Sequence, residues 1–281
     1  MLGNLDNEVI FKKAFTDKLV LTTFVHDVLG IDVEFDKIET EKQFSPKIGD
    51  IDIKLDIFAE SKDKRVVVEL QRIQYDYNFD RFLHYFMAAI IEIQKIAKKY
   101  HIDQTVYLIV VMTEPYSYLD KQGYPVRDEV LLLNLNPRTL TGEERAIYGH
   151  QFMLLNPNHP EESTPQATRD WLDLVYQSIH TPTRSTLNRQ NKGIERAIEL
   201  ITLEHLSSAE LTALKDEESM QAKTFRREHT AILKEKTATV LRLHAMGMAN
   251  DLIGQGVGLT EKEVEEIISW SKLSKKERKE R

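Results

Sequence analysis

The run Thr105–Met112 restricts the fold of this chain more than any other segment, because it is continuously apolar and rich in β-branched residues. A strand that is apolar on both faces needs a cover on each of them, as in the interior of a parallel or mixed sheet. We therefore predict a strand that is buried on both faces, with helices packed above and below it.

The segments around this strand alternate between helical and extended patterns. Gly30 follows a predicted helix at the position where a left-handed residue ends many helices. The predicted helices are Asn4–Phe15, Asp17–Leu29, Asp76–Gln94 and Thr168–Ser178, and the further predicted strands are Val130–Leu135 and Ala146–Leu155. Helices and strands in this order indicate an α/β fold with one mixed sheet flanked by helices.

Residues Asp76–Gln94 give the strongest helical signal, with Asn78 as the expected N-cap. The apolar stripe predicted for this helix is Phe79, Phe82, Leu83, Phe86, Met87 and Ile90. Arg81 and Tyr85 are four residues apart on a flank of the stripe, so their side chains lie on the same side of the helix. One interpretation is that both side chains face a functional site. The alternative is that Arg81 forms an ordinary surface ion pair and Tyr85 is an aromatic residue at the boundary of the core.

A composition change near His180–Gln190 suggests a linker between residues 1–180 and a helical, highly charged region at residues 190–281. Ala245–Ile268 resembles a helix-turn-helix in outline, with a capping box formed by Thr260 and Glu263. The second helix is acidic, which suits phosphate poorly, so we favour packing or homo-oligomerisation over DNA binding. The basic residues after Lys272 are interpreted as a solvated tail.

The hairpin Asp50–Gln71 carries the most unusual polar residues of the chain. On its first strand Asp52 and Asp56 share one face, while Ile53, Leu55 and Ile57 occupy the other. On its second strand Glu69 follows three valines and is expected to be half-buried, which costs free energy unless a cation compensates it. A pair formed by Glu69 and an acid of the first strand predicts a site for a hard divalent ion.

Composition and motifs exclude several other chemistries. The chain has no cysteine, so disulfides, zinc–thiolate sites and cysteine nucleophiles are excluded. It contains no Gly-x-x-x-x-Gly-Lys-Ser/Thr loop, no Gly-x-Gly-x-x-Gly and no His-Glu-x-x-His. The net charge of -7 argues against bulk coating of nucleic acid. No apolar run approaches the roughly 20 residues of a membrane helix, and no signal peptide is apparent, so we expect a cytoplasmic protein without membrane contact.

Four motifs in order resemble the PD-(D/E)xK nuclease family transposases, the recombination-promoting nuclease group. These motifs are Phe11–Phe15 after an acid, Leu55–Ile57, Val67–Gln71, and Arg81 followed by Tyr85 on a helix. The resemblance covers roughly residues 1–180 in motif order, and the ending of the chain also resembles the C-terminal part of that family. It implies a restriction-endonuclease-like sheet with an α-helical C-terminal extension.

The resemblance also implies the roles of individual residues. Asp56 and Glu69 would hold Mg²⁺ or Mn²⁺ together with the backbone carbonyl after Glu69, and Asp52 becomes a rim residue. Gln71 would be the third catalytic residue, where the wider superfamily has lysine; its amide can orient water but cannot take a proton. Glu8 matches an outer metal ligand, although its place in a first helical turn is equally explained by the helix dipole.

Arg81 and Tyr85 match positions beside the active site, and Leu55 stands where the superfamily has proline. The sequence therefore predicts a metal-dependent DNA endonuclease of a recombination-linked mobile element, self-associating through its C-terminal helices. The alternative is a nuclease fold with little or no turnover that serves as a DNA-binding or oligomerising module.

Overall fold

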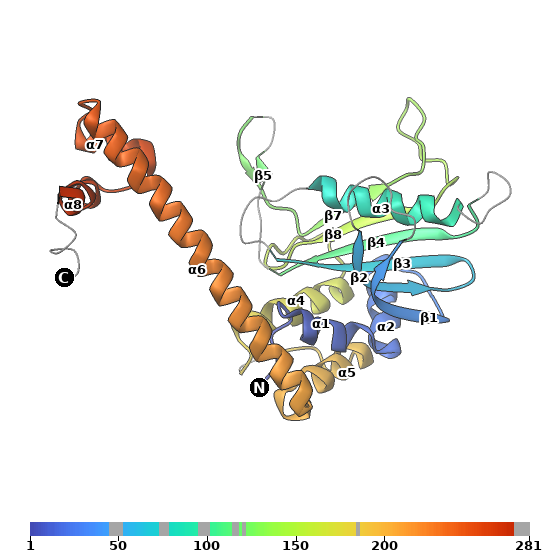
Figure 1. Ribbon diagram of the computed structural model, residues 1–281. Helices are drawn as coiled ribbons and strands as arrows, with labels where there is room; N and C mark the ends of the chain where they lie inside the picture. Colours follow the sequence, from blue (N-terminus) through green and yellow to red (C-terminus); the bar gives the residue numbers. More distant parts are fainter. Residues whose placement is uncertain are drawn as a thin grey trace. The chain divides into compact units, whose positions relative to one another are not determined.

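The computed structural model describes residues 1–44, 53–72, 79–94, 102–113, 118–119, 122–183 and 186–272 (Figure 1). The chain divides into two compact units, Met1–Leu214 and Lys215–Arg281. The division falls within the long helix α6, Ser208–Ala245. Among the described residues, no helix is long and apolar enough to cross a membrane.

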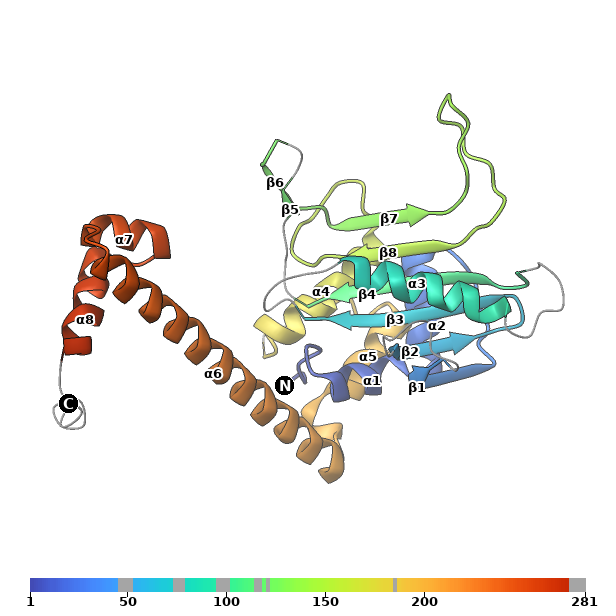
Figure 2. The same cartoon turned by 45° about the horizontal axis from the view of Figure 1, so that its top comes forward.

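The first unit is built on a six-stranded mixed sheet in the order β1-β2-β3-β4-β8-β7 (Figure 2). The strands are β1 (Lys37–Gln43), β2 (Lys54–Glu60), β3 (Lys64–Gln71), β4 (Thr105–Met112), β7 (Val130–Asn134) and β8 (Gln151–Leu155). Strand β4 is parallel to both of its neighbours, β3 and β8, and it is buried from Val106 to Met112. The predicted central strand and α/β fold are confirmed. A separate hairpin pairs β5 (Tyr118–Leu119) with β6 (Pro125–Val126).

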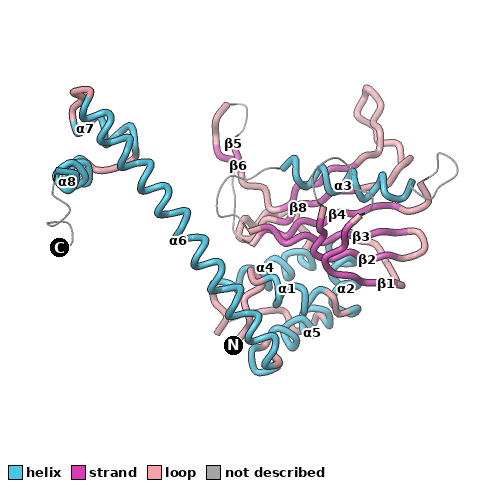
Figure 3. The backbone as a smooth tube through the Cα atoms, in the orientation of Figure 1, coloured by secondary structure: helices cyan, strands magenta, loops and turns pink. Residues whose placement is uncertain are grey.

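Helices cover both faces of the sheet (Figure 3). On one face lie α1 (Glu8–Phe15), α2 (Lys18–Leu29), α4 (Gln166–His180) and α5 (Lys192–Ile201), and on the other lies α3 (Phe79–Gln94). The side chains of Asn7 and Asp17 cap α1 and α2, and Gly30 ends α2 with a φ of 67°. The end of α2 at Gly30 and its start near Asp17 agree with the prediction, whereas the first helix was predicted from Asn4 and begins at Glu8.

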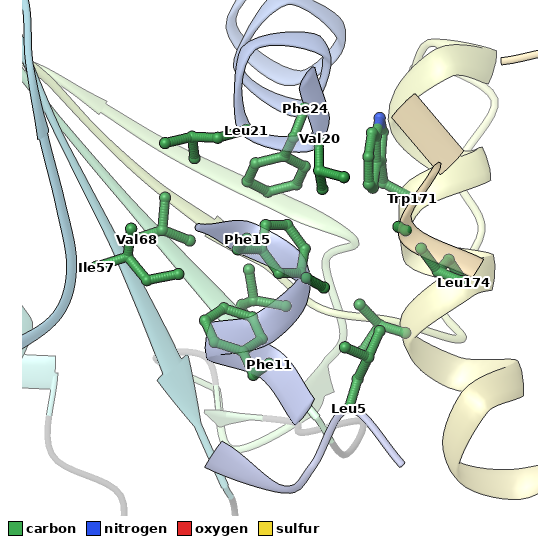
Figure 4. Packing of buried hydrophobic residues seen from close by; sticks show 14 of the residues in the cluster. Leu5, Phe11, Phe15, Val20, Leu21, Phe24, Ile57, Val68, Trp171 and Leu174 are labelled. Atoms are coloured by element: carbon green, nitrogen blue, oxygen red, sulfur yellow. The ribbon is translucent and has the colours of Figure 1, made fainter. Parts of the chain in front are cut away.

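Aromatic side chains fill the space between the sheet and the four-helix face (Figure 4). The rings of Phe11 and Phe15 stack at 4.5 Å between centroids, and Phe24 meets Trp171 edge-on at 5.2 Å. The sheet contributes Ile57 and Val68, among others, to this cluster. The cluster fixes α1 against the sheet, so the first turn of α1 lies at a defined place.

The buried face of α3 differs from the predicted stripe. Its buried residues are Phe82, Tyr85, Phe86, Ala88, Ala89 and Ile93, whereas Leu83 and Met87 are 40% and 51% exposed. The small residues Ala88 and Ala89 face the sheet, so the helix is rotated relative to the stripe of its largest apolar residues. Tyr85 is therefore a buried residue of this face. The expected cap, Asn78, lies outside the described residues.

Helix α5 packs within the first unit, although the sequence placed the linker before it, at His180–Gln190. Its apolar stripe, Ile194, Ala197, Ile198 and Ile201, is buried in the large cluster. Asp27 of α2 accepts hydrogen bonds from Trp171 Nε1 of α4 and from Asn191 Nδ2 at the start of α5. Among the described residues α5 packs against α1, α2 and α4, within the first unit, which extends to Leu214.

We expect Gly193→Ala to destabilise the first unit, because α5 approaches α2 closely at Gly193. A Cβ at this position would lie 2.5 Å from Cβ of Thr23. Overpacking of this kind costs about 1–3 kcal/mol, which chemical unfolding measures. Gly256 of α7 (Asn250–Val257) is the matched control, because a Cβ there meets nothing within 4 Å. Gly256→Ala should leave stability unchanged or raise it, and equal losses in the two variants would contradict the packing argument.

The described part of the second unit contains most of α6, with α7 and α8 (Glu261–Lys272). Its core is small and consists of Val240, Ile253, Val264 and Ile268. The Thr260 N–H and hydroxyl both donate to Glu263, and the Glu263 N–H donates to the Thr260 hydroxyl, which confirms the predicted capping box. Helix α6 is continuous over Ser208–Ala245, within the region predicted to be helical and highly charged.

Candidate active site

The backbone pairing between β2 and β3 ends at Ile57–Val68. Beyond this pair, the carboxylates of Asp56 and Glu69 accept hydrogen bonds from main-chain N–H groups. The Asp56 N–H donates to Glu69 Oε1 at 3.0 Å, and the Leu70 N–H donates to Asp56 Oδ2 at 2.9 Å. Each acid therefore accepts a main-chain donor from the strand opposite its own. These bonds hold the Asp56 and Glu69 side chains in place where the two strands stop pairing.

Along β2 the regular alternation of side chains between the two faces of the sheet is interrupted at Asp56. Ile53 and Leu55 belong to the cluster under α3, whereas Ile57 belongs to the cluster on the opposite face. The sequence analysis placed all three on one face, and this prediction is wrong because the alternation is broken between Leu55 and Ile57. Asp50 and Asp52, the earlier acids of the hairpin, lie outside the described residues.

Glu69 is only 1% exposed, and its Oε2 is buried without a hydrogen-bond partner in the described structure. Burial raises the pKa of the Glu69 carboxyl well above its usual value, and the charge of Asp56 raises it further. Burial also raises the pKa of Asp56, and the charge of Glu8 adds to this effect, while the Leu70 N–H opposes it. The pair is therefore costly to ionise fully without a cation.

A cleft of about 310 Å³ opens beside this pair. The described residues that line it are Glu8, Asp56, Leu70, Gln71, Arg72 and Arg81. Two acids and two arginines thus meet at one opening, with Glu69 buried next to Asp56. The structure brings together the residues predicted from the β2–β3 hairpin, from the first helix and from α3.

Gln71 and Arg81 are in contact at the cleft. The Gln71 amide nitrogen donates to the Arg72 carbonyl at 2.5 Å, and its oxygen accepts from Arg81 Nη1 at 3.5 Å. Arg81 Nε donates to the Tyr85 hydroxyl at 3.0 Å, and the guanidinium lies 5.2 Å from the centroid of that ring. Tyr85 is outside the cleft lining as described and acts on the cleft through Arg81.

Two basic residues of this region were missed by the sequence analysis. Arg72 lines the cleft and donates from Nε to the Asp6 carbonyl at 2.6 Å. Lys12 donates to Glu8 and, at 3.0 Å, to Glu41. The signals were present, since Arg72 follows Gln71 directly and Lys12 lies one helical turn after Glu8, where their side chains can meet.

The donor set fits a hard divalent cation in part. Two neighbouring carboxylates with raised pKa values, one of them with an unpartnered oxygen, are oxygen ligands that such an ion prefers. Within the part of the chain that the structure describes, no group of three or more His, Asp or Glu side chains is arranged to hold a metal. Two protein carboxylates with water as the remaining ligand is a common arrangement for Mg²⁺.

Comparison with known proteins gives one match. A family model described as PD-(D/E)XK nuclease family transposase matches residues 6–227, a span that includes every residue proposed for the site. No curated protein and no solved structure matches the chain.

Proposed function

Because the chain belongs to the PD-(D/E)XK nuclease family transposases, we propose that it is a metal-dependent DNA endonuclease with its centre at Asp56 and Glu69. The observation that carries the proposal is the exchange of hydrogen bonds between these acids and the opposite strands, beside a cleft lined by arginines. An ion-pair network that only stabilises the fold would not need a buried, unpartnered carboxylate oxygen.

Asp56 and Glu69 would hold the ion, Mg²⁺ or Mn²⁺, with Glu8 as an outer ligand at the same cleft. Such an ion activates water and offsets the negative charge that develops on the phosphate. The protein fixes the ligands before the ion arrives, because the N–H groups of Asp56 and Leu70 orient both carboxylates. This arrangement reduces the reorganisation that binding requires.

The other residues of the cleft bind and orient the substrate. Arg72 and Arg81 place positive charge at the opening, where a phosphodiester would lie. Tyr85 restricts the rotamers of Arg81 through its hydroxyl and its ring. The Gln71 amide oxygen accepts from Arg81, so Gln71 has a positioning role and does not remove a proton. The prediction of self-association through the C-terminal helices stays a prediction.

Cleavage of supercoiled plasmid DNA in the presence of Mg²⁺ tests this function. Asp56→Asn and Glu69→Gln keep an oxygen that can accept the same main-chain hydrogen bond, so the strand ends stay in place. We expect each variant to lose at least about a hundredfold in rate, because each lacks one anionic oxygen ligand. If the variants cut as well as the parent, the assignment of the site is wrong. If the parent cuts with neither Mg²⁺ nor Mn²⁺, a DNA-binding or oligomerising module is the better description.

A further inference from the structure

Four side chains of alternating charge follow one another beside the cleft, in the order Glu8, Lys12, Glu41 and Lys54. Lys12 donates to the Glu8 carboxylate of its own helix and to Glu41 of β1 at 3.0 Å. Glu41 also pairs with Lys54 of β2 at 3.1 Å. The Lys12 side chain is 16% exposed, whereas that of Lys54 is 51% exposed. Lys12 is therefore the enclosed cation of this row, held by acids from two elements.

Glu41 adopts a backbone conformation that is unusual for its residue type. Its φ is 56°, in the left-handed region, although it is not glycine. Its neighbours Thr40 and Lys42 pair with Ile57 and Leu55, so Glu41 lies across from Asp56 in the sheet. This conformation is unfavourable for a residue with a Cβ, and such strain persists only where the surroundings enforce it. The residue with this conformation is also the one whose carboxylate accepts a hydrogen bond from Lys12.

The charge of Lys12 reaches the acids of the site. Burial alone would lower the pKa of Lys12, but its hydrogen bonds to Glu8 and Glu41 outweigh burial and raise that pKa above its usual value. In turn, Lys12 contributes to lowering the pKa of both Asp56 and Glu69 against the effect of burial. Lys12 is not among the described residues that line the cleft, whereas Glu8 is. Lys12 therefore contacts the cleft through Glu8, in addition to the effect of its charge on the two acids.

We propose that Lys12 is a positioning residue that holds the Glu8 carboxylate at the edge of the metal site, and that its ion pair with Glu41 keeps Lys12 in place. This inference rests on the proposed function, because it assumes that Glu8 is an outer ligand of the ion. Gln71 stands where a lysine could supply positive charge from β3, and here the positive charge near the acidic pair comes from Lys12 of α1 and Arg81 of α3.

A double-mutant cycle on Lys12 and Glu8 tests the proposal, with Mn²⁺ affinity from isothermal titration as the first readout and plasmid cleavage as the second. We expect Lys12→Met to weaken Mn²⁺ binding about tenfold, as loss of an outer-shell partner commonly does. Glu8→Gln should weaken it by a similar factor. Adding Lys12→Met to Glu8→Gln should cause no further loss, because residues that act through each other are not additive.

The controls separate positioning from folding. Lys12→Arg keeps the charge and should stay within about threefold of the parent. Lys13→Met removes the adjacent lysine, which pairs with Glu210 and lines another cleft, and should not change Mn²⁺ affinity. Glu41→Gly relieves the strained φ, so it should preserve or raise the melting temperature while it weakens Mn²⁺ binding.

Several results would overturn the role of Lys12. They are an unchanged affinity in Lys12→Met, an equal loss from Lys12→Met in the parent and in Glu8→Gln, or the same loss in Lys13→Met. Failure of the proposed function looks different. In that case Asp56→Asn and Glu69→Gln bind Mn²⁺ as the parent does, whatever the Lys12 variants do.

Discussion

Glu69→Gln is expected to make the protein more stable at pH 8 and, at the same time, to slow DNA cleavage at least about a hundredfold. The side chain is 1% exposed, and both burial and the charge of Asp56 raise the pKa of the carboxyl well above its usual value. An amide avoids the cost of burying that charge and can keep the hydrogen bond from the Asp56 N–H. The direction of the pKa shift predicts a higher free energy of unfolding for the variant, which chemical unfolding measures.

The sign of the pH dependence follows from the direction of that shift. Because the pKa of Glu69 is higher in the folded state, its contribution to stability is fully present below the unfolded value, 4.5, and is lost as the pH rises through the folded-state pKa. Parent and variant should therefore differ little at low pH and diverge as the pH rises. Chemical unfolding with a chelator present, at a series of pH values up to 9, measures the divergence.

Two controls accompany this experiment. Glu162→Gln changes an exposed carboxylate and should shift stability by no more than about 0.5 kcal/mol. Added Mn²⁺ should raise the melting temperature of the parent and have little effect on Glu69→Gln, because an ion stabilises only a folded state that binds it. A variant that is less stable than the parent at pH 8 would show that the Glu69 charge is compensated within the protein itself.

Arg65→Ala should cause a large loss of stability. Arg65 of β3 is 6% exposed and pairs with Glu60 of β2 at 2.5 Å and with Glu92 of α3 at 2.6 Å. It also donates to the Ala89 carbonyl at 3.0 Å and lies 5.1 Å from the centroid of the Phe58 ring. Breaking a buried pair typically costs 3–5 kcal/mol; because both glutamates are partly exposed, we expect about 3 kcal/mol.

Urea unfolding of the whole chain measures this loss. Arg145→Ala is the matched control, since Arg145 pairs with Glu143 on the surface, where both side chains are at least half exposed. Such a pair contributes about 0–1 kcal/mol. Arg65→Met separates charge from packing, because it fills the space but leaves both glutamates without a cation. If Arg65→Met is as stable as the parent, the side chain serves mainly as packing.

Local signals in the sequence predicted much of the fold. The end of α2 at Gly30 was predictable because the end of a helix depends on neighbouring residues. The central strand β4 was predictable because burial on both faces leaves a continuous apolar run. The rotation of α3 and the packing of α5 were not predictable, since both depend on which distant surfaces are available to cover them.

Some features of the candidate site were also predictable from the sequence, and others were not. The order of motifs along the chain gave Asp56, Glu69, Gln71, Arg81 and Tyr85. The sequence did not show that β2 changes face at Asp56 or that each acid accepts a donor from the opposite strand. It also did not show that Lys12 meets Glu41, which is 29 residues away in the chain. These features arise from tertiary contacts and from a backbone conformation that no local pattern specifies.

Asp56 and Glu69 have a structural role besides the proposed metal binding, because they accept main-chain hydrogen bonds at the end of the β2–β3 ladder. If the proposed function holds, a descendant that no longer cuts DNA would still need acceptors for the N–H groups of Asp56 and Leu70, so substitution at these positions should favour asparagine and glutamine over alanine. In related chains, an amide at either position would then mark a lost activity with a preserved fold. Alanine at either position would indicate that the strand ends themselves have rearranged.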